Sequence, residues 1–458
     1  MSVATEPVEI DKDLRSLLLS DDAFWPAEPK SIPDTGLSNS FIEALICKYL
    51  AICGTTSGRA IADALGLPYR ILAPLYDSLR TRQLLVHVGA APFNDYHFTL
   101  SEQGRAHARS YLDECAYVGP APVPLSKYVI SVEAQSITGV APKRQELIQA
   151  FQGISIEPKL FASLGPAINS GAGMFLYGAP GNGKSTIAQK LTACFGQTIW
   201  IPHAVIEGGQ LILLYDPAFH HVIEDASEGL LRQKDYDRRW LQIRRPSVVV
   251  GGELTLDNLE MHCNRQININ EAPLQMKSNC GCLLLDDFGR QRIAPNDLLN
   301  RWIIPLESRH DFLTMANGRK IQVPFEQLII FSTNLEPEDL VDEAFLRRIA
   351  YKIEIGDPSI EEFHYLFKIY CQHFGCEYRK DVVTYLIDTH YRPLNRAMRR
   401  CHPRDLLTQI RNFCRYNDLS LELRPEYFDN VVHSYFAMVL KERTDRVRYG
   451  NTGPIKVT

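Results

Sequence analysis

Short, uninterrupted runs of apolar residues recur through the middle of the chain, and several of them end in polar or charged residues. An apolar run without polar alternation is typical of a strand buried on both faces, as in a parallel sheet. A run at 174–177 leads through a glycine-rich turn into a helix-forming segment that begins at 184, and another run follows at 198–203. This succession of strand, helix and strand predicts an α/β sheet. Further strand-like runs lie at 211–217, 246–252, 283–285 and 327–334.

Strand-like and helical patterns alternate over residues 143–357, which we expect to form an α/β core. Within it, residues from about 204 to 280 are interpreted as an insertion that contains a β-hairpin and stands out of the core, because connections of this length are usually functional or disordered. Apolar residues at helical spacing then dominate residues 358–441 and predict a compact α-helical domain, or lid.

The segment 41–118 has a pattern of its own. A predicted helix ends at Gly66, and a second one begins after Pro68. Two strands joined by a turn follow within 84–100, and a closing helix completes the segment. In the order of these elements, and in the stretches LRTRQLLVHV and YHFTLSEQGR, the segment resembles the winged-helix domain of MarR-like regulators. The resemblance implies a winged-helix fold.

Three segments lack sustained periodicity. Residues 1–40 are rich in Asp, Glu, Pro and Ser and are predicted to be a flexible extension. Alternating prolines in 119–142 predict an extended, semi-rigid linker. Residues 442–458 are predicted to be a solvated tail.

The glycine-rich turn after the first apolar run carries the clearest chemical signal. Its sequence, GAPGNGKST, fills the pattern G-x-x-x-x-G-K-[ST]. In that pattern backbone N–H groups curl round phosphate, the lysine reaches the β- and γ-phosphates, and the serine hydroxyl holds Mg²⁺. The turn therefore predicts a site for a nucleoside triphosphate with Mg²⁺. Its residues are Gly178, Ala179, Pro180, Gly181, Asn182, Gly183, Lys184, Ser185 and Thr186.

Polar residues stand at the ends of two later apolar runs. Asp286 and Asp287 follow the run at 283–285, and Asn334 ends the run that begins at 327. If these runs are parallel strands of one sheet, their carboxyl ends meet at one edge. An acid there would hold Mg²⁺ through water, and its neighbour would orient an attacking water.

A helix and a β-hairpin with Asn317 and Gly318 at its turn are predicted between these runs, and Arg347 and Arg348 precede a further strand. Across about 140–440 the chain resembles the AAA+ ATPase family. GAPGNGKST is similar to Walker A, LLLDDFG to Walker B, LIIFSTN to sensor 1, AFLRRI to the arginine-finger region and CHPRDLLTQI to a sensor 2 helix. The hairpin before sensor 1 is similar to the branch that holds MoxR-type ATPases, magnesium-chelatase subunits and enhancer-binding activators.

The resemblance implies a P-loop NTPase sheet with a C-terminal helical lid, and ATP and Mg²⁺ as ligands. By resemblance, Asp286 would position Mg²⁺ together with Ser185. Asn334 would help to align the water, and Arg404 would sense the γ-phosphate within its own subunit. Arg348, in preference to Arg347, would be the finger that acts on a neighbouring subunit's nucleotide. The active form would then be a homo-oligomeric ring, most often a hexamer.

Two features depart from the family pattern. Asp287 stands where the family usually has Glu, and its side chain is one methylene shorter, which predicts slow hydrolysis or a weaker hold on the water. The expected insertion contains no GAFTGA-like sequence. This argues against the mechanism of the sigma-54 activators.

Composition sets broad limits on function. The 458-residue chain is 45% hydrophobic and 22% charged, with a formal net charge of −5, as is ordinary for a soluble globular protein. Binding to nucleic acid would therefore need a local basic patch. No apolar run approaches the roughly 18 residues of a membrane span, and the first residues carry charges where a signal peptide needs an apolar core. We expect a cytoplasmic protein without membrane contact.

The cysteines are scattered singly, as expected of reduced thiols. Cys371, His373 and Cys376 invite a metal interpretation, but their spacing lacks the two close ligand pairs of structural zinc sites. Buried helix cysteines are the favoured interpretation.

Three functions remain open. The favoured one is a chaperone-like ATPase that remodels an unidentified protein client and docks it through the winged helix. The second is a DNA-binding ATPase or transcriptional regulator, with Arg70, Arg80 and Arg82 as candidate nucleic-acid contacts. The segment is barely basic, so docking and DNA binding have nearly equal weight. The third is a nucleotide-gated switch with slow hydrolysis.

Overall fold

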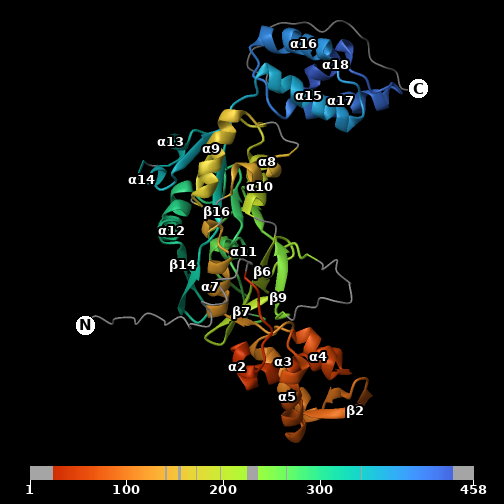
Figure 1. The fold of residues 1–458 in the computed structure, drawn as a ribbon, viewed down its shortest axis with the longest axis vertical. Coiled ribbons are helices and arrows are strands. Elements are labelled where there is room, and N and C mark those ends of the chain that lie inside the picture. The colour runs from red at the N-terminus through yellow and green to blue at the C-terminus, as the bar shows by residue number, and fades with distance from the viewer. Residues whose placement is uncertain are drawn as a thin grey trace. The chain divides into compact units, whose positions relative to one another are not determined.

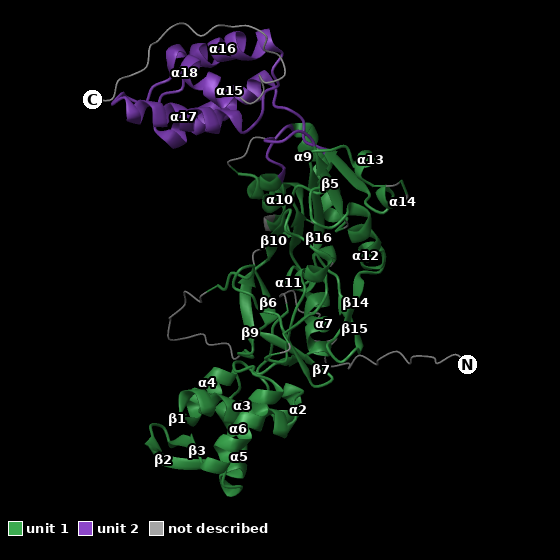
Figure 2. Cartoon of the chain, turned by 180° about the vertical axis from the view of Figure 1, so that it is seen from behind, with its two compact units in different colours: residues 1–152, 158–177, 185–353 green, residues 153–157, 178–184, 354–458 purple. Residues whose placement is uncertain are grey.

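The computed structural model describes residues 24–139, 142–152, 156–171, 173–195, 198–223, 236–264, 266–341 and 343–436. The chain divides into two compact units (Figure 2). Unit 1 comprises residues 1–152, 158–177 and 185–353, and unit 2 comprises 153–157, 178–184 and 354–458. The predicted tail and the first 23 residues of the predicted extension lie outside the described residues.

A five-stranded sheet organises the α/β part of the chain (Figure 1). The strands are, in spatial order, β10 (Ser247–Val250), β13 (Cys282–Leu285), β16 (Leu328–Thr333), β5 (Met174–Tyr177) and β17 (Tyr351–Glu354). The first four pair in parallel. Every residue of β13 and β16 is buried, as uninterrupted apolar runs predict. The predicted α/β class with a parallel sheet is confirmed.

The strand order places β5 where the chain connections diverge. From β5 the chain passes to β10 at one edge, returns through β13 to β16, and then reaches β17 on the other side of β5. In open α/β sheets ligands bind outside the carboxyl ends of the strands at such a switch point. The glycine-rich turn begins directly after β5.

Helices pack on the apolar sheet. Trp302 of α12 (Pro295–Ser308) is fully buried and lies in one cluster with Phe175 of β5 and Phe331 of β16. The other helices in this part of the chain are α8 (Arg144–Ala150), α9 (Pro158–Asn169), α10 (Lys184–Thr192), α11 (Leu274–Lys277), α13 (Pro337–Leu340) and α14 (Glu343–Leu346).

In the described residues 204–223, 236–264 and 266–280 the expectation of an insertion that stands out of the core is wrong, because their strands join the sheets of unit 1. The predicted hairpin is present as β7 (Ala204–Glu207) and β8 (Gln210–Leu213). It joins a second five-stranded sheet with the order β11-β12-β8-β7-β4, and β10 belongs to the central sheet. The other strands of this second sheet are β4 (Val123–Pro124), β11 (His262–Asn264) and β12 (Ile269–Glu271). Strands β6 (Thr198–Pro202) and β9 (Trp240–Arg244) belong to neither of these two sheets.

The hairpin predicted before the strand at 327–334 is confirmed as β14 (His310–Thr314) and β15 (Lys320–Pro324). Gly318 has a φ of +80° at its turn, which suits glycine. Leu313 and Ile321 of this hairpin are buried in one cluster with Val205 and Ile212 of the second sheet. This shared apolar cluster holds the β7–β8 hairpin against the β14–β15 hairpin.

The N-terminal segment contains the predicted helices and strands, and a short additional strand that the pattern did not indicate. Ser57 caps α4, and Gly66 ends it in a left-handed conformation. The three strands form an antiparallel sheet of order β1-β3-β2. The elements are α2 (Ile32–Thr35), α3 (Asn39–Cys53), β1 (Thr55–Ser57), α4 (Gly58–Leu65), α5 (Tyr69–Thr81), β2 (Leu85–Ala91), β3 (Asp95–Leu100) and α6 (Glu102–Glu114).

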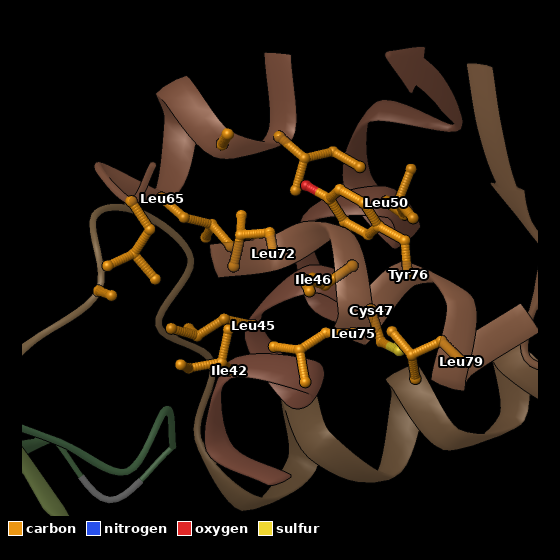
Figure 3. Close-up of a cluster of buried hydrophobic side chains, with 14 of the residues drawn as sticks. Ile42, Leu45, Ile46, Cys47, Leu50, Leu65, Leu72, Leu75, Tyr76 and Leu79 are labelled. Carbon is orange, nitrogen blue, oxygen red and sulfur yellow. The ribbon is translucent and has the colours of Figure 1, made fainter. Parts of the chain in front are cut away.

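Residues of α3 and α5 interdigitate in the core of this segment, as Figure 3 shows for Ile42, Ile46 and Leu75. The same cluster includes Ala204 and Leu211 of the second sheet. The N-terminal segment and the second sheet therefore share one hydrophobic core.

The segments on either side of this core are more ordered than predicted. Leu37, within the predicted extension, is buried in the cluster, and α2 precedes it. Within the predicted linker, Tyr128 and Val132 of α7 (Leu125–Ala134) are buried against the second sheet. The alternating prolines dominated the prediction, although the apolar residues behind them have helical spacing.

Unit 2 contains the helices predicted for 358–441, described through residue 436. Phe363 and Phe367 of its first helix pack with Leu406, Ile410 and Phe428 in one buried cluster. The helices are α15 (Ile360–Phe374), α16 (Lys380–Leu386), a π-helical turn (Ile387–Tyr391), α17 (His402–Tyr416) and α18 (Pro425–Tyr435).

Candidate functional site

Three polar side chains from separate elements of unit 1 meet at the carboxyl edge of the central sheet. Asp286 follows β13 and accepts hydrogen bonds from the Ser185 hydroxyl at 2.7 Å and from the Ser332 hydroxyl at 2.8 Å. Ser185 lies 101 residues earlier in the chain. Carboxylate and hydroxyl oxygens are the hard ligands that Mg²⁺ takes, so this donor set fits that ion.

The backbone around Asp286 is fixed on two sides. Its N–H donates to the carbonyl of Val250 at 2.8 Å, and its carbonyl accepts from the Gln291 side chain at 2.9 Å. The three residues before it in β13 are fully buried. The carboxylate is therefore held by the sheet and does not depend on a mobile loop.

Asp287 turns away from Asp286 into solvent. Its φ of +51° is in the left-handed region, and its N–H donates to Asp286 Oδ1 at 3.1 Å. Asn334 Nδ2 donates to Asp287 Oδ1 at 3.0 Å. Two residues singled out for water alignment thus lie within hydrogen-bond distance, on an exposed part of the same sheet edge.

The glycine-rich turn, residues 178–184, belongs to unit 2 and is called the phosphate loop here. Lys184 is 7% exposed, and its ammonium donates to the carbonyls of Gly178 at 2.9 Å and Ala179 at 3.1 Å. Gly178, Gly181 and Gly183 all have positive φ values, which explains the need for glycine at each. Pro180 and, just beyond the loop, Thr186 are exposed.

Asn182 has a role that the sequence did not reveal. Its side chain is fully buried, and Nδ2 donates to Asp357 Oδ1 at 2.8 Å and to the Ile355 carbonyl at 3.4 Å. The Arg400 N–H donates to Asn182 Oδ1 at 3.4 Å. The only hint in the sequence is an amide side chain at a variable position of the motif.

The three arginines assigned by resemblance have different surroundings. Arg348 forms a half-buried ion pair with Glu307 at 2.5 Å, and Arg347 is exposed. Arg404 lies near the start of α17, where its side chain is 58% exposed and pairs with Asp405 at 2.9 Å. The hydrogen bond that Arg404 donates to the Asp405 carboxylate raises the pKa of its guanidinium above the usual value.

The three candidate nucleic-acid contacts each face a carboxylate. The pairs are Arg70 with Glu28 at 2.6 Å, Arg80 with Asp77 at 3.6 Å and Arg82 with Glu43 at 2.9 Å.

The β2–β3 hairpin, residues 85–100, contains no Lys or Arg. At its tip Phe93 is 83% exposed, and Val88 on β2 is 59% exposed.

Within the described part of the chain, no group of three or more His, Cys, Asp or Glu side chains is placed to hold a metal ion. Cys371 is buried in the helical core of unit 2, and burial raises the pKa of its thiol to about 12. Nor does any described helix have both the length and the apolar character needed to cross a membrane.

Comparisons with known proteins give limited matches. A family model described as a domain of unknown function (DUF8689) matches residues 359–434, within unit 2. No curated protein sequence matches the chain.

Two solved structures of NtrX from Brucella abortus match part of the chain. The one in complex with ADP has a TM-score of 0.36 at 12% identity, over 62% of this chain and 56% of that chain. The other has a TM-score of 0.37 at 13% identity, over 61% and 55%. The chain thus spans little more than half the length of these NtrX chains. A structure of the complex between subunits BchI and BchD of magnesium chelatase has a TM-score of 0.29 at 16% identity, over 63% of this chain and 92% of that chain.

Proposed function

We propose that this protein is an AAA+ ATPase that couples Mg²⁺-dependent hydrolysis of ATP to the remodelling of a protein partner. The observation that carries the proposal is the 2.7 Å hydrogen bond between Ser185 and Asp286. A serine that follows a phosphate loop and an acid that ends a buried parallel strand are the two elements that hold the metal ion in P-loop NTPases.

Each residue of the site has a proposed task. Lys184 and the backbone N–H groups of the phosphate loop bind the β- and γ-phosphates. Ser185 and Asp286 would hold Mg²⁺, which when bound neutralises charge on the phosphates. Asp287 accepts a proton from the attacking water, and Asn334 orients that carboxylate and the water.

The remaining charge on the γ-phosphate calls for a further cation. We assign this task to Arg348 of a neighbouring copy, which makes the active form a homo-oligomer, with a hexameric ring as the expected form. The ion pair with Glu307 keeps the Arg348 guanidinium on the surface at the end of α14. Such an arginine stabilises the developing charge in phosphoryl transfer.

The N-terminal segment, which we propose to be a winged helix, suits a protein partner better than DNA. Phosphate contacts need cationic side chains. Here the candidate arginines already face carboxylates, and the β2–β3 hairpin has no cation. Exposed apolar side chains such as Phe93 are typical of protein contact sites.

Hydrolysis tests the proposal. ATP turnover is measured for the wild-type protein, for Asp287→Asn and for the control Asp339→Asn, which changes an exposed acid on α13. Loss of a general base costs about 10²–10⁴-fold in rate, so Asp287→Asn should still bind ATP but turn over at least about a hundredfold more slowly. The control should match the wild type. A wild-type protein that binds ATP without turnover would support the nucleotide-gated switch instead.

DNA binding is tested with the whole chain, because the N-terminal segment shares its core with the second sheet. Mobility of a short DNA duplex is measured at several salt concentrations. We expect no retardation even at low salt. Retardation that weakens steeply with salt, and weakens further in Arg70→Ala, would show phosphate contacts and support the DNA-binding alternative.

A further inference from the structure

A single carboxylate in unit 2 joins the phosphate loop to the segment that precedes α17. Asp357 Oδ1 accepts a hydrogen bond from Asn182 Nδ2 at 2.8 Å and also forms an ion pair with the guanidinium of Arg399. Asn182 is fully buried, whereas the Arg399 side chain is 25% exposed. The loop amide and the guanidinium therefore share one acceptor oxygen.

The backbone holds the same two segments together. The N–H of Cys401 donates to the Gly181 carbonyl at 2.9 Å, and the N–H of Arg400 donates to Asn182 Oδ1. A Cβ atom placed on Gly181 would lie 2.6 Å from Cys401 Sγ and 3.7 Å from the Cβ of Arg399. The Arg399 side chain thus starts directly beside the phosphate loop.

Arg404, to which the resemblance gives the phosphate-sensing role, is placed differently. It lies within α17, its side chain is 58% exposed, and it pairs with the adjacent Asp405. Arg399 instead shares its partner with a loop residue. A triphosphate is a stronger partner for arginine than one carboxylate, since the guanidinium fork binds phosphate oxygens bidentately.

We propose that Arg399, and not Arg404, is the arginine of unit 2 that contacts the terminal phosphate of ATP, and that Asp357 is the competing partner that Arg399 gives up when ATP binds. This inference rests on the proposed function. On ATP binding, the γ-phosphate replaces Asp357 as the partner of Arg399, while Asn182 keeps its hydrogen bond to Asp357. ADP lacks the γ-phosphate and leaves the Asp357–Arg399 pair intact, so the pair distinguishes the two nucleotides.

The test is a titration of the full chain with ATP and with ADP, in the presence of Mg²⁺, read by calorimetry. Arg399→Ala should weaken ATP binding by about tenfold or more, the usual cost of a lost charged hydrogen bond, and change ADP binding by less than about twofold. Arg404→Ala is the matched control and should leave both affinities unchanged.

Asp357→Asn gives a readout that a merely structural role would not produce. The asparagine carbonyl still accepts from Asn182, but the ion pair with Arg399 is lost. ATP binding should therefore become several-fold tighter, and this gain should vanish in the double variant Asp357→Asn/Arg399→Ala. Arg399→Lys keeps the positive charge but lacks the planar guanidinium. It replaces Arg399→Ala in the test if the alanine variant fails to fold. It should weaken ATP binding less than alanine does.

The outcomes distinguish a failure of the proposed function from a failure of this inference. A wild-type protein that binds neither nucleotide would overturn the proposed function and this inference together. If the wild type binds ATP but Arg404→Ala loses the preference for ATP and Arg399→Ala keeps it, only the inference is wrong. Weaker ATP binding by Asp357→Asn, with an equal loss of ATP affinity when Arg399 is also replaced, would overturn the inference as well.

Discussion

The buried ion pair of Arg239 and Asp237 is expected to be a main support of unit 1. The Arg239 side chain is fully buried, and that of Asp237 is 5% exposed, with 2.8 Å between Nη2 and Oδ2. Arg239 Nη1 also donates to the carbonyls of Thr35 at 2.9 Å and Pro122 at 3.2 Å. One guanidinium thus joins the end of α2, the residue before β4 and the residue before β9.

Arg239→Met removes this connection and leaves a buried carboxylate without its cation. Breaking one partner of a buried pair costs about 3–5 kcal/mol. The neighbouring residue provides the control, because Arg238 forms an exposed pair with Asp63, at 54% and 67% side-chain exposure. Arg238→Ala should change the free energy of unfolding by about 0–1 kcal/mol.

Urea unfolding followed by tryptophan fluorescence measures the difference. Trp200 and Trp240 lie in one cluster with Tyr236, close to the pair, and report on this region. With a slope of about 1–3 kcal/mol per molar urea, Arg239→Met should lower the midpoint by about 1 M or more. The double variant Asp237→Leu/Arg239→Met should recover part of the loss, because no buried charge remains. Equal midpoints for Arg239→Met and Arg238→Ala would refute this reasoning.

Two further predictions concern subunit exchange and pH. Arg348→Ala and Asp287→Asn proteins should each be inactive alone, but a mixture of the two should regain ATP turnover. One subunit then supplies the arginine, and its neighbour supplies the carboxylate. A fully active Arg348→Ala protein would contradict this prediction. Burial, followed by the charge of Arg399, lowers the pKa of His402 to about 4 from 6.5. The unfolded state then binds the proton first, so stability should fall as pH drops from about 6.5 to 4. Chemical unfolding across this range should show a shallower loss for His402→Gln, and equal slopes would show that His402 is not responsible.

The sequence predicts those parts of the fold that local patterns determine. The apolar runs of β13 and β16 had to be buried strands, and the phosphate loop and the turn at Gly318 follow from short motifs. Asp286 and Asn334 could be brought to one sheet edge because each follows such a strand.

Other features depend on contacts between distant segments, and no local pattern encodes them. Arg239 and Trp240 stand in a charged part of the sequence, yet both side chains are buried, since Asp237 and two distant carbonyls satisfy the charge of Arg239. Asp357 and Asn182 are 175 residues apart, and neither stands in a pattern that indicates the other.

Calorimetric titration with ATP and Mg²⁺ shows whether the phosphate loop binds ATP. The wild-type protein is compared with Lys184→Ala and with the control Lys190→Ala, which removes a lysine from the same helix, α10. We predict saturable ATP binding in the wild type and the control. The ATP affinity of Lys184→Ala should be weaker by about tenfold or more. Equal ATP affinity in Lys184→Ala and the wild type, or no binding in any of the three proteins, would mean that the phosphate loop is not an ATP site.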